Sequence, residues 1–243
     1  MFVGIEWFTL LACVSSVFLG GVVQGFFGYG LGLLVLPALA ILEPRSLPQV
    51  ILLLGFPSVA WMAFHERRSR VLDGVRPLLL GRLLGTAIGL IALFSLAENL
   101  LTIGFGLVTI GMVAGTGLSR VPIEINARNN LLAGTFSGIM GTTAGVGGTP
   151  IAMLYSRRLA SEMRSTLSVV LLLGSTMSLI GITAIGRIRA VDLILTLLCF
   201  PALIVGMGLS SWLVKQASPS VFRALLLTVS AVSGLVVILS AVM

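Results

Sequence analysis

Long runs of residues without a charge are the feature that most constrains this chain. No Asp, Glu, Lys or Arg occurs from 7 to 42. Further uncharged runs cover 47–64, 83–97, 99–119, 129–156, 165–186, 193–214 and 224–243. A helix needs about 20 apolar residues to cross the hydrocarbon core of a bilayer. The chain therefore has material for at least eight membrane passes, and its longest polar connection, 65–76, is too short for a soluble domain.

Composition supports a membrane protein and narrows the function classes. Only 9% of the residues are charged, whereas soluble domains average about 25%. The net charge of +7 comes from arginines and lysines in loops beside apolar runs, which the positive-inside rule explains without a nucleic-acid partner. Cys13 and Cys199 lie singly in apolar runs, and His65 lies in a basic loop. The sequence therefore predicts no metal site, no cofactor and no enzyme.

A glycine-rich stretch occurs twice in the chain at one constant offset. Residues 21–37 and 134–150 match without a gap, and Arg45 and Arg158 keep the same offset. The matched pairs are Gly21/Gly134, Gly25/Gly138, Gly28/Gly141, Gly32/Gly145 and Pro37/Pro150. Internal repetition of this kind predicts two homologous transmembrane halves, 1–120 and 121–243.

Each half is expected to contain five apolar segments. The predicted segments are 7–27, 29–42, 47–64, 77–96 and 99–118 in the first half, and 129–141, 143–156, 165–185, 192–213 and 222–242 in the second. We expect the first two of each half to form a glycine-rich broken hairpin and the other three to span the membrane. The predicted fold class is an all-α polytopic membrane protein with eight to ten membrane segments.

The loop charges indicate whether the first two segments form one broken crossing or turn back on each other. Loops on the cytoplasmic side carry the excess of Lys and Arg. One crossing would leave eight basic residues on one side and six on the other, whereas a returning hairpin gives eleven against three. The sequence therefore predicts returning hairpins, either re-entrant or fully spanning. It also predicts inverted halves, both termini outside the cytoplasm and a bacterial inner (plasma) membrane location.

The turns of the two hairpins are the candidate substrate site. Backbone that leaves helical geometry inside a bilayer needs partners from protein or ligand, and helix N-termini attract anions. The candidate substrate-binding residues are Gln24, Gly25, Gly28, Tyr29, Gly30, Gly32, Ser137, Gly141, Thr142, Thr143, Gly145, Gly147, Gly148 and Thr149. Helix packing is the alternative, and GxxxG spacing favours it for Gly21, Gly25, Gly134 and Gly138. Pro37 and Pro150 either kink their helices or, in the second half, follow a Thr149 cap.

Arg82 is the only charge well inside an apolar run. Ionisable residues within a membrane are functional candidates, so Arg82 is a possible gating or anion-attracting residue. The alternative is a side chain that snorkels from the cytoplasmic end of its segment to the interface. No carboxylate lies in the middle of a predicted span, which argues against a proton relay through buried acids.

The two glycine-rich stretches resemble the TauE/SafE sulfite-exporter family, whose pattern is GxxxGxxGxGGGxxxxP. The second copy keeps Gly145, Gly147 and Gly148, whereas the first has Leu31 where a glycine is often found. The resemblance extends over nearly the whole chain and implies transport of sulfite, sulfoacetate or another small oxyanion.

Taken together, these features predict a secondary transporter or exporter of a small anion that works by alternating access. Its partners would be the anion and the lipid bilayer. A passive anion channel and a transporter of a small carboxylate are the alternatives, and an intramembrane enzyme or assembly factor is less favoured. The sequence leaves the direction of transport, the coupling ion and the oligomeric state open.

Overall fold

The computed structural model describes residues 6–66, 75–96, 124–155 and 160–213, with single positions at 100, 103, 104, 107, 111 and 158. All the regular elements in this part of the chain are helices. They are α1 (Trp7–Phe27), α2 (Leu31–Leu42), η1 (Pro44–Ser46), α3 (Gln49–His65), α4 (Val75–Ser95), α6 (Ala127–Ala144), α7 (Gly148–Leu154), α8 (Ala160–Ala184) and α9 (Ala190–Leu213). The all-helical fold class is confirmed, and the predicted segments 99–118 and 222–242 lie largely outside the described residues.

Glycines at positive φ set the boundaries of the two broken helices. Gly28 (φ 85°) ends α1, and Gly30 (φ 117°) precedes α2. In the second half α6 continues to Ala144, and Gly145 (φ 72°) ends it. The prediction that the next helix covers 143–156 is therefore wrong at its start, because α7 begins only at Gly148. Left-handed backbone of this kind is accessible to glycine without steric cost.

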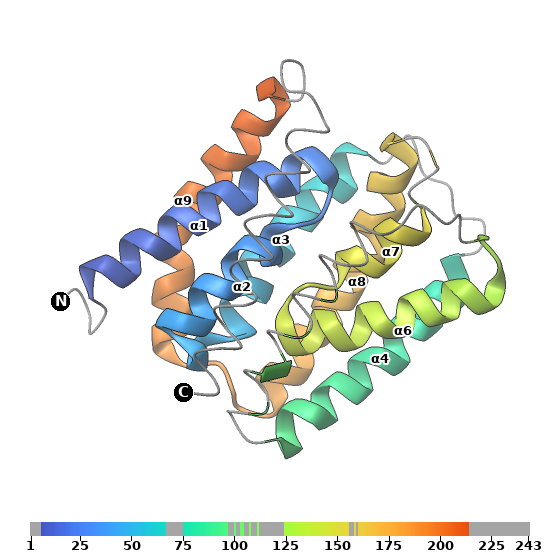
Figure 1. Ribbon diagram of the computed structural model, residues 1–243, viewed down its shortest axis with the longest axis horizontal. Helices are drawn as coiled ribbons and strands as arrows, with labels where there is room; N and C mark the ends of the chain where they lie inside the picture. The colour runs from blue at the N-terminus through green and yellow to red at the C-terminus, as the bar shows by residue number, and fades with distance from the viewer. Residues whose placement is uncertain are drawn as a thin grey trace.

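Both broken helices turn back on themselves, as Figure 1 shows. In the first half the start of α2 lies against α1, because a Cβ added to Gly30 would overlap Val23 of α1. In the second half Tyr155, after the end of α7, donates a hydrogen bond to Asn130 near the start of α6, at 3.0 Å. A single crossing would separate these residues, so the returning hairpin is confirmed for both halves.

The helix surfaces match a lipid environment. Among the described residues, four helices, α1, α4, α8 and α9, are long and apolar enough to cross a membrane. Their outer faces carry exposed large apolar side chains such as Phe94 on α4 and Leu197 and Ile204 on α9. Extended apolar surface of this kind marks contact with membrane. The chain is a multi-pass membrane protein.

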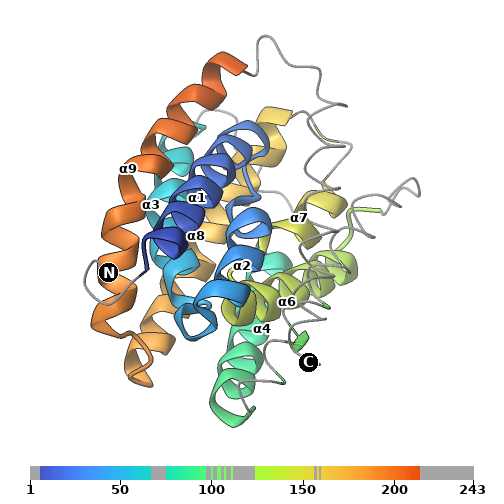
Figure 2. The ribbon, with the colours of Figure 1, turned by 60° about the vertical axis from the view of Figure 1, so that its left-hand side comes forward.

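Helices of opposite halves pack against each other in parallel pairs. Figures 1 and 2 show α1 beside α9 and α4 beside α6. Glycines form both contacts: Gly21 lies against Leu203, and Gly134 lies against the carbonyl of Leu78. A Cβ on either glycine would press on the backbone of the partner helix. The packing interpretation of these glycines is therefore confirmed.

The third pair, α3 and α8, runs antiparallel through the centre of the molecule. Near one end, Glu66 after α3 pairs with Arg164 in the first turns of α8, at 2.7 Å. At the other end, Gln49 at the start of α3 donates a hydrogen bond to the carbonyl of Arg187 after α8, at 3.0 Å. Each half contributes one helix to every pair, whereas the inversion of the two halves stays a prediction.

Candidate functional site

The tips of the two hairpins meet at the centre of the helix bundle. A Cβ on Gly32 would overlap the carbonyl of Gly145, and a Cβ on Gly148 would overlap Tyr29. Gly32 and Gly145 are one of the pairs related by the constant offset, so equivalent parts of the repeat contact each other. Close backbone approach between the hairpins therefore requires glycine at this point.

A cavity of about 60 Å³ lies at this contact and extends toward α3, α4 and α8. A buried water needs about 10–15 Å³ in this measure, so the cavity has room for several waters or for a small anion. Its lining includes many of the predicted site residues: Gln24, Tyr29, Gly30, Gly32, Arg82, Gly141, Gly145, Gly147, Gly148 and Thr149. The two hairpin turns thus line one common cavity.

Arg82 reaches this cavity from α4 and is only 2% exposed. Its guanidinium occupies space that three glycines leave free, since a Cβ on Gly141, Gly147 or Gly174 would overlap it. These glycines come from α6, the α6–α7 turn and α8. The snorkelling interpretation of Arg82 is therefore wrong: glycine at these positions lets the charged group enter the protein interior.

The hydrogen bonds of Arg82 to described residues go to neutral oxygens. Nη1 donates to the backbone carbonyl and, at 2.7 Å, to the hydroxyl oxygen of Ser137. The Ser137 hydroxyl in turn donates to the carbonyl of Gly147 at 2.5 Å. Arg82 Nε is buried without a partner, and no carboxylate in the described part of the chain pairs with the guanidinium. A buried cation with unused donors favours an anionic ligand.

Two predicted polar residues help to shape the hairpins. Gln24 is 3% exposed, and its side-chain oxygen accepts a hydrogen bond from the backbone N–H of Leu31, at 3.2 Å. This bond satisfies one donor of the first turn of α2. Thr149 is buried in the first turn of α7, where Gly147 precedes the helix. The prediction that Thr149 caps a helix opening at Pro150 is therefore wrong.

Five predicted site residues do not line the cavity, namely Gly25, Gly28, Ser137, Thr142 and Thr143. Gly25 packs against Ser210 of α9, and Gly28 packs against Arg164. Thr142 shares a hydrogen bond with Ser178 at 2.7 Å, and the hydroxyl of Thr143 donates to the carbonyl of Ile139 at 2.8 Å. Ser137 borders the cavity through its hydrogen bonds with Arg82 and with the carbonyl of Gly147. These residues hold the hairpins in place.

Sequence reasoning missed the contribution of the antiparallel pair. Gly55 of α3 and Ser175 of α8 line the cavity, and Gly174 admits the guanidinium. A Cβ added at Gly55 would meet nothing within 4 Å. The signal for Gly55, Gly174 and Ser175 in the sequence was a small or polar residue inside an apolar run, and such residues are common in membrane helices. None of the three belongs to the glycine and proline pairs that the constant offset matches.

One comparison with known proteins gives a match. The family model described as Sulfite exporter TauE/SafE matches residues 13–237. No curated protein and no solved structure gives a significant match. The matched range contains both hairpins, Arg82 and the antiparallel pair.

Proposed function

Because the chain belongs to the sulfite exporter TauE/SafE family, we propose that it is a secondary transporter of a small oxyanion such as sulfite, sulfoacetate or a related organosulfonate. The observation that carries this proposal is Arg82, a buried guanidinium without a described carboxylate partner beside the cavity between the hairpins. Charge-assisted hydrogen bonds from such a group recognise oxyanions by geometry as well as by charge.

The rest of the cavity supports an anion with a small apolar part. Apolar side chains of α3, α8 and the second hairpin, including Ile51, Val146 and Leu171, line it together with the hydroxyl-bearing Ser175. The oxyanion group would lie at Arg82, and the methylene group of a molecule such as sulfoacetate would lie against the apolar wall. In this arrangement sulfite, which has no methylene group, would leave part of the apolar wall uncovered.

We further propose alternating access between two inverted halves. Exchange of the halves would map the α1–α9 pair onto α6–α4, and the α3–α8 pair onto itself. The parallel direction of the first two pairs and the antiparallel direction of the third are those that inverted halves require. Inverted repeats with broken helices at a central site are a recurrent design of secondary transporters.

Charge distribution supports a bacterial inner membrane orientation. Arg67, Arg68 and Arg70 follow α3 in the sequence, and Arg76 lies at the start of α4, which favours the cytoplasm for the Glu66 end of the bundle. Both termini would then lie on the periplasmic side.

The proposal is tested by reconstituting the full chain in liposomes and measuring uptake of sulfite and sulfoacetate. Arg82→Gln removes the charge, and we expect transport to fall by about 10-fold to 100-fold, because a hydrogen bond to a charged group is worth about 1.5–3 kcal/mol. Arg82→Lys keeps the charge without the planar fork and should have an intermediate rate.

Arg158→Gln is the matched control, because it removes an arginine whose side chain is 48% exposed in an i,i+4 pair with Glu162. Its transport rate should stay within about twofold of the wild type. A folded Arg82→Gln protein with an unchanged rate would contradict the proposed site. Saturable counterflow, in which an internal unlabelled anion accelerates entry of the labelled one, separates a transporter from a passive channel.

A further inference from the structure

A second cavity, of about 310 Å³, lies at the Glu66 end of the antiparallel pair, apart from the central cavity. Its lining combines charged, aromatic and small residues: Gly25, Trp61, Met62, His65, Glu66, Arg164, Met207 and Ser210. We name it the outer cavity. It borders the first hairpin turn, because Gly28 lies against both Met62 and Arg164.

Arg164 connects the outer cavity to the hairpin turn. Its Nη2 pairs with Oε1 of Glu66 at 2.7 Å, and its Nη1 donates to the carbonyl of Phe26 at 3.5 Å. Its Nε is buried and has no hydrogen-bond partner. The carbon stem packs on Gly28, where a Cβ would lie 2.9 Å from Cγ of Arg164. One guanidinium thus contacts α3 and the turn between α1 and α2, with one donor unused.

We propose that Arg164 is a second anion-binding residue, on the access path to the central cavity, and that a small oxyanion displaces the Glu66 carboxylate from it. This inference rests on the proposed transport of an oxyanion. In the structure Glu66 is the acceptor on Nη2. An oxyanion with three oxygens accepts from Nη2 and Nε together, which is the planar two-bond geometry that arginine favours.

Displacement is feasible because the ion pair is not deeply buried. The side chains of Arg164 and Glu66 are 25% and 20% exposed, and partly exposed ion pairs contribute little, about 0.2–1 kcal/mol. Glu66 released from Arg164 would face the outer cavity, which gives its carboxylate access to water. Arrival of the anion then removes the link between α3 and α8 directly beside the first hairpin turn.

The test uses Trp61, which lines the outer cavity and stacks on His65 with ring centroids 4.3 Å apart. The chain has three tryptophans, so Trp7→Phe and Trp212→Phe make Trp61 the sole reporter. Sulfite is titrated into this full-length protein in nanodiscs at constant ionic strength, and Trp61 fluorescence is followed. Glu66→Gln removes the competing carboxylate, and we expect the apparent Kd for sulfite to fall about fivefold.

Arg164→Gln should abolish the saturable fluorescence response, and Arg164→Lys should weaken binding to a lesser degree. Arg158→Gln is the matched control and should leave the response unchanged. A response that persists in folded Arg164→Gln, or an apparent Kd that is unchanged or raised in Glu66→Gln, would overturn the inference. If Arg164→Gln does not fold, the Glu66→Gln titration decides the question by itself.

Arg82→Gln in the same reporter protein separates this inference from the proposed function. Outer binding should persist in that variant while transport falls by about 10-fold to 100-fold. An unchanged transport rate in Arg82→Gln would contradict the central site but not the outer site. A missing Trp61 response in a protein that transports would contradict the outer site but not the central site.

Discussion

The two ends of the antiparallel α3–α8 pair are held together in different ways. At one end a single ion pair, Glu66 with Arg164, joins two partly exposed side chains beside the outer cavity. At the other end the carboxylate of Asp192 is fully buried and accepts hydrogen bonds from Ser46 at 2.6 Å and from Arg189 at 2.9 Å. The first link is partly exposed, whereas the second is part of a buried network.

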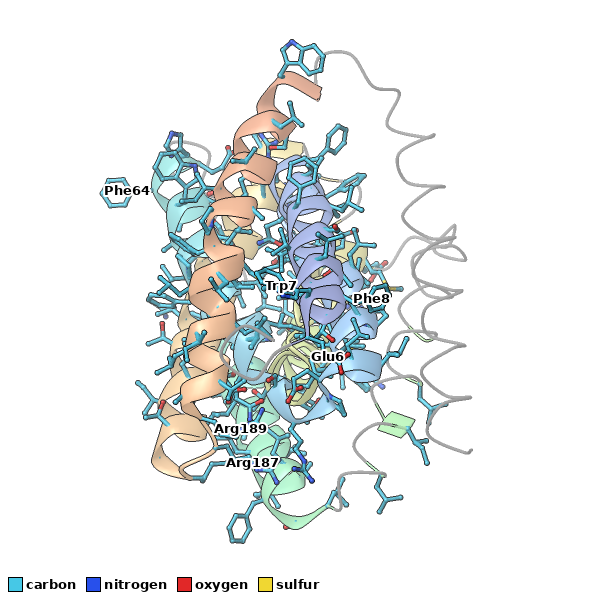
Figure 3. All side chains as sticks on the ribbon, turned by 90° about the vertical axis from the view of Figure 1, so that its left-hand side faces the viewer. Glu6, Trp7, Phe8, Phe64, Arg187 and Arg189 are labelled. Atoms are coloured by element: carbon cyan, nitrogen blue, oxygen red, sulfur yellow. The ribbon has the colours of Figure 1, made fainter. Side chains whose placement is uncertain are left out.

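Further contacts reinforce the Arg189 end. The backbone N–H of Arg189 donates to Asp192 at 2.8 Å, and its Nη2 donates to the hydroxyl of Ser46 at 3.0 Å. Figure 3 shows Arg187 and Arg189 at the end of the molecule opposite to Phe64, which lies near the end of α3. We infer that this conformation is closed tightly at the Arg189 end and opens more easily at the Glu66 end.

The contribution of the Arg189 charge to this network does not depend on pH near neutrality. Hydrogen bonds to Asp192 raise the pKa of Arg189 above its ordinary value. A raised pKa for a cation means that its stabilising contribution is complete below the ordinary pKa and is lost only as pH rises through the higher, folded value. Arg189 therefore keeps its charge, and with it the pairing to Asp192, as pH rises through the physiological range.

The largest expected effect comes from removing the buried carboxylate. Asp192→Ala leaves Ser46 and Arg189 without their shared acceptor and should lower the free energy of unfolding by about 2–3 kcal/mol, reduced from the value for fully buried pairs because Arg189 is partly exposed. The measurement is denaturation followed with a thiol-reactive dye, since Cys13 and Cys199 are both free and buried until the protein unfolds.

Glu43→Gln is the control at the same end. Glu43 pairs with Arg189 at 3.7 Å from a side chain that is 33% exposed, so its loss should cost less than about 0.5 kcal/mol. If Asp192→Ala destabilises the protein no more than Glu43→Gln does, the contrast between the two ends is wrong.

A smaller effect is expected in the accessibility of the central cavity from the two sides. Gly55→Cys places a thiol in that cavity with free space around it, in a background with Cys13→Ala and Cys199→Ala. A charged, membrane-impermeant thiosulfonate should modify it about tenfold faster from the Glu66 side, equivalent to about 1.4 kcal/mol in the cost of opening.

Two single cysteines establish which side the reagent reaches. His65→Cys lies at the Glu66 end, and Arg45→Cys lies in η1 at the Arg189 end. Each should react from one side only. Equal rates at Gly55→Cys from both sides, or a faster rate from the Arg189 side, would reverse the assignment of the loosely closed end.

Local sequence signals predicted the hairpins well but not the contacts between distant helices. Two of the repeated glycines, Gly28 and Gly145, mark the turns with left-handed backbone, and the offset pair Gly32 and Gly145 meets in the structure. The depth of Arg82 could not be read from its own segment, since burial depends on glycines in α6 and α8, among them Gly141 and Gly174. The all-helical class followed from the long uncharged apolar runs.

The ionic links at the two ends of the α3–α8 pair also could not be predicted from local sequence. The sequence places Asp192 at the start of the predicted segment 192–213, where charges are expected at a membrane interface. Asp192 is buried only because η1 and the α8–α9 loop come together, which brings Ser46 within 2.6 Å. No local sequence pattern predicts the contact between η1 and the α8–α9 loop. The difference in how the two ends of the α3–α8 pair are held is therefore visible only in the three-dimensional structure.

The smallest expected effect is the loss of stability in Glu66→Gln. The substitution keeps the shape of the side chain and removes the charge opposite Arg164, so the free energy of unfolding should fall by about 0.5–1 kcal/mol. Glu162→Gln is the matched control, because it removes the same charge from the surface pair with Arg158 at 3.8 Å, and it should cost about 0.3 kcal/mol. Both are measured with the same thiol-reactive dye. A loss in Glu66→Gln as large as that in Asp192→Ala would show that the Glu66 link is as firm as the buried network, and the Glu66 end would then not open more easily.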